Sequence, residues 1–73
     1  MTIKVIGTVI YQDLGVGTWA VITPNQQTYE LKDPPTPLRQ SGLKVEIEGV
    51  IREDIMTIAM IGPVLEVKSF LVL

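Results

Sequence analysis

The amino-acid sequence predicts an all-β protein in which five to six strands form a small barrel, with one short helical turn between the third and fourth strands. Three observations lead to this fold class. Valine, isoleucine and threonine dominate the apolar runs, and β-branched side chains favour strands. Glycines interrupt two of these runs, as a small sheet requires where it bends to close on itself. One proline-rich segment divides the runs and leaves room for a single helical turn.

The first predicted strand is Ile3–Tyr11. Both of its faces are partly apolar, with Val9 on one face and Ile6 and Ile10 on the other. A strand of this kind lies in a barrel wall or is shared between two sheets. Gly7, in the middle of the run, indicates a sharp bend or a bulge.

The next segments predict a hairpin. A loop with two glycines, Gln12–Gly17, leads to a second strand at Trp19–Thr23. The turn Pro24–Gln27 follows, where proline and asparagine suit the turn positions. The third strand, Thr28–Lys32, alternates between apolar and polar residues, with Tyr29 among the inward ones.

The segment Asp33–Gly42 contains three prolines and is incompatible with a strand. A single helical turn fits Pro37–Gln40, with Thr36 as the N-cap and Gly42 as the residue that ends it. A longer helix does not fit, so we expect this segment to connect two strands.

The second half of the chain predicts further strands. Leu43–Arg52 alternates most clearly, and Glu53-Asp54 then forms a turn. Ile55–Ile61 returns from that turn as a strand, and Val64–Leu73 forms the last strand. A helix over residues 55–65 is the competing interpretation, but this uncharged run is rich in β-branched residues and too short to cross a membrane as a helix.

This order of elements is the layout of a closed or partly open OB-like barrel, which places a helical element between strands three and four. An SH3-like barrel is the alternative, although it needs a helical turn late in the chain. Residues 1–73 make one domain. We expect Gly7 and Gly49 to lie in adjacent strands, where the sheet curves most sharply.

Glycines, one tryptophan and several core positions form a pattern that spans nearly the whole chain. The pattern is Gly7-Thr8-Val9, Gly17-x-Trp19, Tyr29-x-Leu31, Gly42-Leu43-x-Val45, Gly49, Arg52-x-Asp54, Thr57-Ile58-x-Met60-x-Gly62 and Val64-x-Glu66-Val67. In this pattern the chain resembles a group of small prokaryotic OB-fold-like domains, most of which are uncharacterised. Some members have His or Trp where this chain has Ala59 and Ile61. The resemblance implies a fold and no activity.

The composition offers little for catalysis or for metal binding. The sequence has no cysteine and no histidine, which excludes disulfides and the usual Cys/His zinc site. Two pairs of carboxylates, Glu46/Glu48 and Glu53/Asp54, fall on a solvated strand face and in a turn, where their pKa values are rarely tuned for acid–base work. We therefore expect no catalytic residue, no metal and no cofactor, and a protein that is not an enzyme.

The charge pattern bears on partners and location. The net charge is −2, and the basic residues are scattered along the chain rather than gathered in a patch. Nucleic-acid binders usually have such a patch, so the charge argues against nucleic acid as the ligand. The N-terminal segment does not read as a signal peptide, and no segment predicts membrane insertion, so we expect a cytoplasmic protein.

The OB-like layout suggests where a ligand would bind. In OB folds the face of strands two and three binds ligands, framed by the loop after strand one and the loop between strands four and five. The candidate ligand-binding residues on this surface are Tyr11, Asp13, Trp19, Tyr29 and Arg52. Aromatic residues there would stack on bases or sugars. Packing is the competing explanation for the aromatic residues, and an ion pair of Arg52 with Asp54 or Asp13 is the competing explanation for the arginine.

The sequence ends in apolar residues that do not alternate with polar ones. Phe70, Leu71, Val72 and Leu73 belong either to a strand covered on both faces or to an exposed interface, and they are our candidate interface residues. We expect a small interaction module that binds a protein partner or forms a homo-oligomer. The alternative is a module that binds single-stranded nucleic acid or an oligosaccharide on the OB face.

Overall fold

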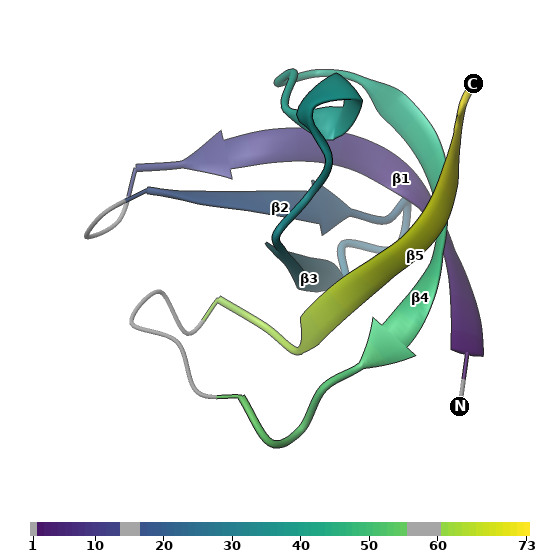
Figure 1. Cartoon of the computed structure of the whole chain (residues 1–73). Coiled ribbons are helices and arrows are strands. Elements are labelled where there is room, and N and C mark those ends of the chain that lie inside the picture. The colour runs from purple at the N-terminus through teal and green to yellow at the C-terminus, as the bar shows by residue number, and fades with distance from the viewer. Residues whose placement is uncertain (1, 14–16, 56–60) are drawn as a thin grey trace.

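The computed structural model describes residues 2–13, 17–55 and 61–73 (Figure 1). The predicted fold class is confirmed, since strands make up most of the ordered elements and one short helical turn separates the third strand from the fourth. The elements are the strands β1 (Thr2–Gln12), β2 (Thr18–Ile22) and β3 (Thr28–Lys32), the 3-10 turn η1 (Thr36–Leu38), and the strands β4 (Lys44–Ile51) and β5 (Val64–Val72).

The five strands close into one ring in the order β1-β2-β3-β5-β4, and β4 pairs again with β1. All neighbours in the ring are antiparallel except β3 and β5, which run parallel. Figure 1 shows the strands surrounding a common interior. Because the ring is closed, each strand has neighbours on both sides along part of its length.

The long strand β1 takes part in both halves of the ring. Its first half pairs with β4, from Thr2 opposite Val50 to Thr8 opposite Lys44. Its second half pairs with β2, beginning with Thr8 opposite Ile22. The strand thus passes from one neighbour to the other at Thr8. Its inward face carries the buried Val5 and Val9, whereas Ile6 on the other face is exposed.

Aliphatic side chains from every element fill the interior. They alternate along the strands with outward-facing residues, as the period of a half-buried strand requires. The buried cluster consists of Val5, Val9, Val21, Leu31, Leu38, Val45, Ile47 and Leu65. Leu38 comes from η1 and is fully buried, so the helical turn covers one end of the ring with an apolar side chain. Each such side chain stabilises the fold by roughly 1.5–3 kcal/mol.

The helical turn begins one residue earlier than the sequence predicted. The cap residue is Pro35 rather than Thr36, and no side chain caps the turn. The Pro35 carbonyl accepts a hydrogen bond from the Leu38 N–H at 2.9 Å, and the Thr36 carbonyl accepts one from the Arg39 N–H at 3.0 Å. Pro37, within the first turn, has no N–H, so one donor fewer is left there for a side-chain cap to satisfy.

The strand predicted at Ile55–Ile61 is not seen in the described part of the chain. Ile55 and Ile61 lie outside strands, and positions 56–60 lie outside the described residues. The turn predicted at Glu53-Asp54 is present. None of the helical segments within residues 2–13, 17–55 and 61–73 has the length and apolar character needed to cross a membrane.

Inward and outward residues alternate along β5, but a bulge interrupts the alternation. Glu48 lies opposite Ser69 but Gly49 lies opposite Val67, so Lys68 is an extra residue in β5. The bulge shifts the inward positions by one residue, and Phe70 packs against the core. The residues that follow Phe70 are exposed. The apolar end of the sequence is thus part core and part surface.

Gly49 lies where two backbones approach closely. A Cβ atom at this position would overlap the carbonyl group of Glu66 in β5, at the site of the bulge. Gly7, in the neighbouring strand β1, lies in the same way against the carbonyl of Ile22. The two glycines are in adjacent strands, as the sequence predicted. A side chain at Gly49 would therefore push β5 away from β4.

We expect Gly49→Val to lower the free energy of unfolding by about 1–3 kcal/mol, although valine has the higher strand propensity. Thr2→Val, at an exposed position in β1, is the control and should change stability by less than about 0.5 kcal/mol. Thermal melts of both variants measure the difference. An unchanged or raised midpoint for Gly49→Val would mean that the close approach does not constrain the ring.

Candidate functional site

Two aromatic residues meet at one end of the barrel, where β1 ends and β2 begins. Tyr11 lies directly opposite Trp19 in the antiparallel ladder. Their ring centroids are 4.9 Å apart and the planes are inclined by 61°, an edge-to-face arrangement. Gly17, with a φ of +89°, leaves room for the Tyr11 hydroxyl, which a side chain at that position would overlap. Tyr11 is 47% exposed, while Trp19 packs against the core.

The other predicted ligand-binding residues are more dispersed. Tyr29 is on β3, opposite Val21, and packs partly buried against the core. Asp13 follows β1 and is exposed. The structure thus brings Tyr11 and Trp19 into contact, and it gives Trp19 and Tyr29 the packing role that was the competing explanation.

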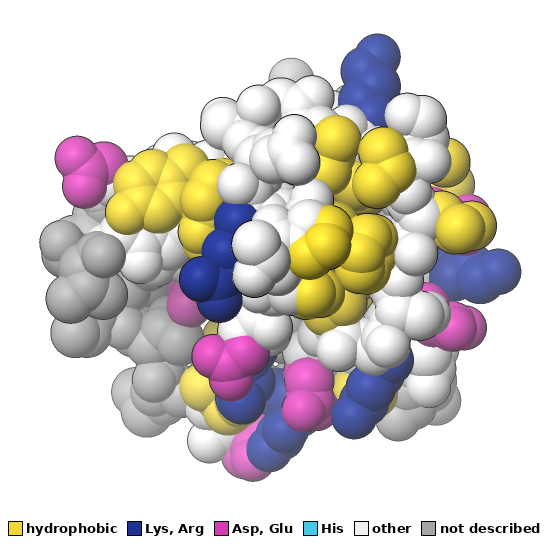
Figure 2. Space-filling view, turned by 45° about the horizontal axis from the view of Figure 1, so that its top comes forward, with side chains coloured by type: hydrophobic (Ala, Val, Ile, Leu, Met, Phe, Trp, Pro, Cys, Tyr) yellow, Lys and Arg dark blue, Asp and Glu magenta, His cyan; other side chains and the backbone are white. Residues whose placement is uncertain are grey.

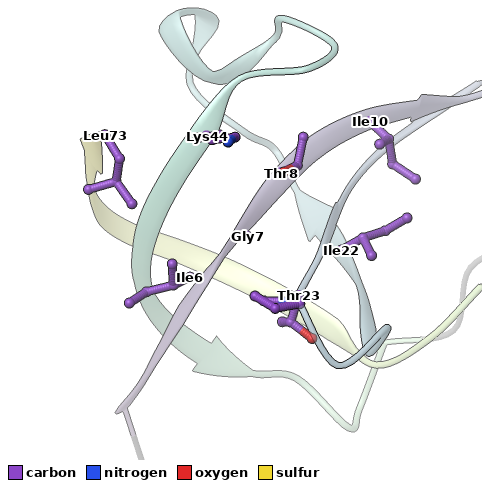
Figure 3. A pocket seen from close by; sticks show the side chains of 9 residues that line it. Ile6, Gly7, Thr8, Ile10, Ile22, Thr23, Lys44 and Leu73 are labelled. Carbon is purple, nitrogen blue, oxygen red and sulfur yellow. The ribbon is translucent and has the colours of Figure 1, made fainter.

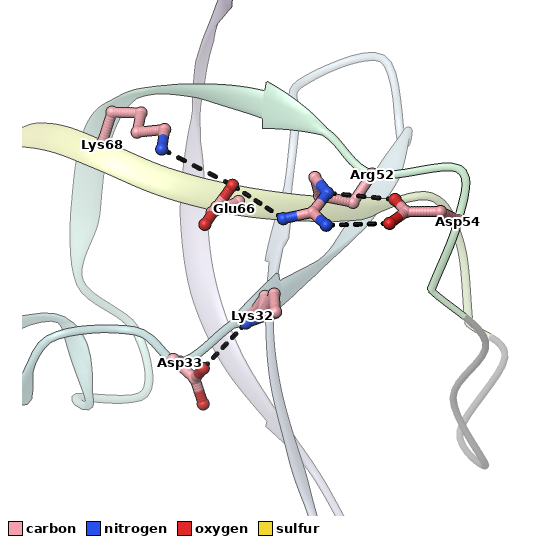
Figure 4. A network of polar contacts seen from close by, with 6 residues as sticks. All are labelled: Lys32, Asp33, Arg52, Asp54, Glu66 and Lys68. Carbon is pink, nitrogen blue, oxygen red and sulfur yellow. Dashed lines mark hydrogen bonds and ion pairs between the residues drawn. The ribbon is translucent and has the colours of Figure 1, made fainter.

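Arg52 lies at the end of β4 and is held by two carboxylates (Figure 4). Its Nε and one terminal nitrogen donate to the two oxygens of Asp54, at 3.0 and 2.8 Å, which is the paired geometry that suits guanidinium best. The other terminal nitrogen donates to Glu66 at 3.1 Å. Lys68 lies 3.6 Å from the same Glu66 oxygen. Asp54 was foreseen as a partner, whereas Glu66 was not.

These contacts shift the pKa values of all three groups in the direction that favours charge. The hydrogen bonds to Asp54 and then to Glu66 raise the pKa of Arg52. The hydrogen bond from Arg52 lowers the pKa of Asp54 and is also the main reason that the pKa of Glu66 is lowered. Two neighbouring carboxylates thus balance the positive charge of the guanidinium, which weakens its attraction for an anionic ligand.

The titratable groups do not form a metal site in the part of the chain that the structure describes. No three carboxylates within residues 2–13, 17–55 and 61–73 gather closely enough to hold an ion. Lys32 and Asp33 form a separate ion pair at 3.0 Å, also drawn in Figure 4. The polar groups in this region stabilise one another, in pairs and in the small network around Arg52.

An apolar groove lies on the outer face of the sheet (Figure 3). It has a volume of about 440 Å³, and most of its lining is apolar. Ile6 and Leu73 lie toward one end of it, and Ile10 and Ile22 lie toward the other. Figure 2 shows hydrophobic side chains grouped on the face that it displays, with charged side chains on several sides of them.

Analysis of the sequence did not identify this groove as a site. The sequence feature that indicates the groove is the second apolar face of the first strand, on which Ile6 and Ile10 lie. The two apolar faces predicted a strand in a barrel wall or one shared between two sheets; the strand lies in the wall, with Ile6 exposed on its outer face. The place of Leu73 in the lining depends on the pairing of β4 with both β1 and the end of β5, which local patterns do not show.

No protein-family model matches the chain, and neither a curated protein nor a solved structure is significantly similar to it.

The free energy of unfolding should fall in acid as Asp54 and Glu66 become protonated. Both carboxyls have lowered pKa values in the folded protein, so their contribution is complete at neutral pH and is lost below about pH 4. Arg52→Met should remove the hydrogen bonds that lower both pKa values and flatten this part of the profile. Arg39→Met is the control, because Arg39 instead donates to the Pro34 carbonyl. Urea unfolding between about pH 2 and pH 7 measures the profiles. Equal acid slopes in the wild type and Arg52→Met would refute this assignment.

Proposed function

We propose that this chain is a non-enzymatic interaction module that binds protein, either a partner or a second copy of itself. Its binding site is the tail surface, which we define as the apolar side chains on the outer face, Ile6, Leu71 and Leu73. The observation that carries the proposal is the exposure of these side chains. Leu71 is 62% exposed and Leu73 is 66% exposed. Large apolar side chains that gather on a small protein without burial mark an interaction site.

The arrangement of the tail surface supports this proposal. Ile6 on β1 lies opposite Glu46 on β4, which in turn lies opposite Leu71 on β5, so these residues form one row across the sheet. Leu73 and Ile6 also line the same groove. Lys44 borders the groove, and Lys4 and Glu48 lie nearby around Leu71. An apolar centre with a polar rim is the usual anatomy of a protein interface.

The ring order supports an OB-like assignment for the module. The order β1-β2-β3-β5-β4 and the helical turn between β3 and β4 are what an OB-like barrel requires. An SH3-like barrel fits less well, because the described helical turn comes before β4 rather than late in the chain. The prokaryotic group that the sequence resembles, and a cytoplasmic location, belong to the same proposal.

We expect Leu73→Ser to reduce association while leaving the fold intact. The side chain is exposed, so the free energy of unfolding should change by less than about 0.5 kcal/mol. Phe70→Ser is the contrast, because Phe70 packs against the core and its loss should cost about 2–4 kcal/mol. Size-exclusion chromatography with light scattering, solubility measurements and thermal melts report these effects. A strictly monomeric wild type that is no less soluble than Leu73→Ser would contradict the proposal.

A second candidate function is binding of single-stranded nucleic acid or an oligosaccharide at the aromatic end of the barrel. The exposed ring of Tyr11 beside Trp19 favours it, because such rings stack on bases and sugars. The net charge of −2 and the neutralised Arg52 oppose it. The aromatic end would bind nucleic acid or an oligosaccharide, whereas the tail surface would bind protein, so the two proposed sites can be tested separately.

A titration with an oligonucleotide at low salt tests this second candidate, since electrostatic binding is strongest there. We expect binding no tighter than about millimolar, equal for the wild type and Tyr11→Ala. Micromolar binding that Tyr11→Ala weakens by about tenfold or more would instead favour the aromatic end as the site.

A further inference from the structure

The strand β5 has one edge that is only partly covered. It pairs with β4 along nearly its whole length, from Leu65 to Val72. It pairs with β3 only through Val64, Leu65 and Glu66, because β3 ends there. Among the described residues, no strand pairs with this second edge beyond Glu66. The closed ring therefore leaves a free sheet edge over the last residues of β5.

The hydrogen-bonding direction along β5 identifies which backbone groups face this edge. The Leu73 N–H donates to the Lys44 carbonyl of β4 at 2.9 Å. In an antiparallel ladder the backbone groups of successive residues point to opposite sides. Leu71 and Leu73 thus direct their groups toward β4, while the N–H and C=O of Phe70 and Val72 point to the free edge.

This part of the edge lacks the usual protection against pairing. Proteins protect sheet edges with charged residues, proline or a bulge. The bulge and the charge of Lys68 protect the middle of β5. From Ser69 to Leu73 there is no charge and no proline, and Leu71 and Leu73 are exposed. Such an edge can accept another strand by main-chain hydrogen bonding.

We propose that the strand which pairs here is β5 of a second copy, running antiparallel about a two-fold axis centred on Leu71. This inference rests on the proposed function of the tail surface and names its partner and its mode of binding. In this register Phe70 lies opposite Val72 of the second copy, and Val72 lies opposite its Phe70. All four residues point their backbone groups at the shared edge, so the pair forms four main-chain hydrogen bonds.

The side chains of the same register are compatible with each other. Leu71 lies beside Leu71 of the second copy on the outer face, and Ser69 lies opposite Leu73. Residues 69–73 carry no charged side chain, so no like charges face each other within this stretch. A self-complementary edge of this kind generates a closed dimer rather than a filament, because the two-fold pairing uses the edge of both copies.

Val72→Pro tests the backbone part of the proposal. Proline removes the N–H that points to the free edge, which the ladder with β4 does not use, and an edge strand tolerates proline in that orientation. Val72→Thr is the matched control, because it keeps the N–H and the strand propensity. In sedimentation equilibrium the wild type and Val72→Thr should form dimers. Val72→Pro should dimerise about 10- to 100-fold more weakly, because each copy loses one hydrogen bond.

Amide hydrogen exchange in the wild type gives a second, independent readout. Exchange at Phe70 and Val72 should slow as the protein concentration rises, whereas Leu71 and Leu73 should be protected at all concentrations by their bonds to β4. If Val72→Pro fails to fold, this measurement on the wild type still tests main-chain pairing at the edge of β5.

Two outcomes would overturn the proposal. A wild type that stays monomeric at about 1 mM excludes pairing with a second copy. Equal dimerisation of Val72→Pro and Val72→Thr excludes main-chain pairing. If Leu73→Ser abolishes association while Val72→Pro does not, the tail surface binds protein through its side chains, and the proposed function stands without edge pairing.

Discussion

The fold depends on one short contact, the parallel pairing of β3 with β5. Three residue pairs, centred on Leu31 and Leu65, close the sheet into a ring. Both leucines belong to the buried cluster, so the same contact that completes the hydrogen bonding also completes the core. Without it the sheet would be an open strip with two edges, and among the described elements only the short turn η1 would lie beside its aliphatic face.

The closure also determines which surfaces are left for binding. The strand β3 is five residues long and β5 is nine, so the ring closes along one end of β5. At its other end β5 pairs with β4 alone among the described strands, which leaves one edge without a neighbouring strand. At the opposite end of the barrel, packing engages Trp19 and Tyr29, and the carboxylates neutralise Arg52. The apolar tail is thus the part of the surface whose exposure the fold itself does not explain.

Local patterns predicted the parts of the fold that local forces determine. The alternation in Thr28–Lys32 placed a strand correctly, and the prolines limited the segment before Lys44 to a single short turn. Gly49 was identified because a mid-strand glycine is costly unless two backbones meet there. These features depend on residues close in sequence, or on a chemical property that glycine alone has.

Register was what the sequence did not reveal. The pairing of Arg52 with Glu66 depends on how β4 lies against β5. The bulge at Lys68 shifts the inward positions of β5 by one residue, so that Phe70 points inward. A search for strict alternation with a period of two therefore misses the tail. The groove beside Leu73 depends on the pairing of β1 with β2 and β4, and of β4 with β5. Each of these depends on the alignment of distant segments, which no short window of sequence contains.

The position of the parallel contact has a consequence for how the molecule reaches its native state. Leu31 and Leu65 are far apart along the chain, so a large loop must close before their pairing can stabilise anything. Proteins dominated by such non-local contacts fold slowly, on timescales of roughly milliseconds to seconds. During that delay the aliphatic lining of the unfinished ring faces water, and the chain is most exposed to aggregation and to capture by chaperones. The step that completes the barrel is therefore the point at which a cell would most readily lose this protein.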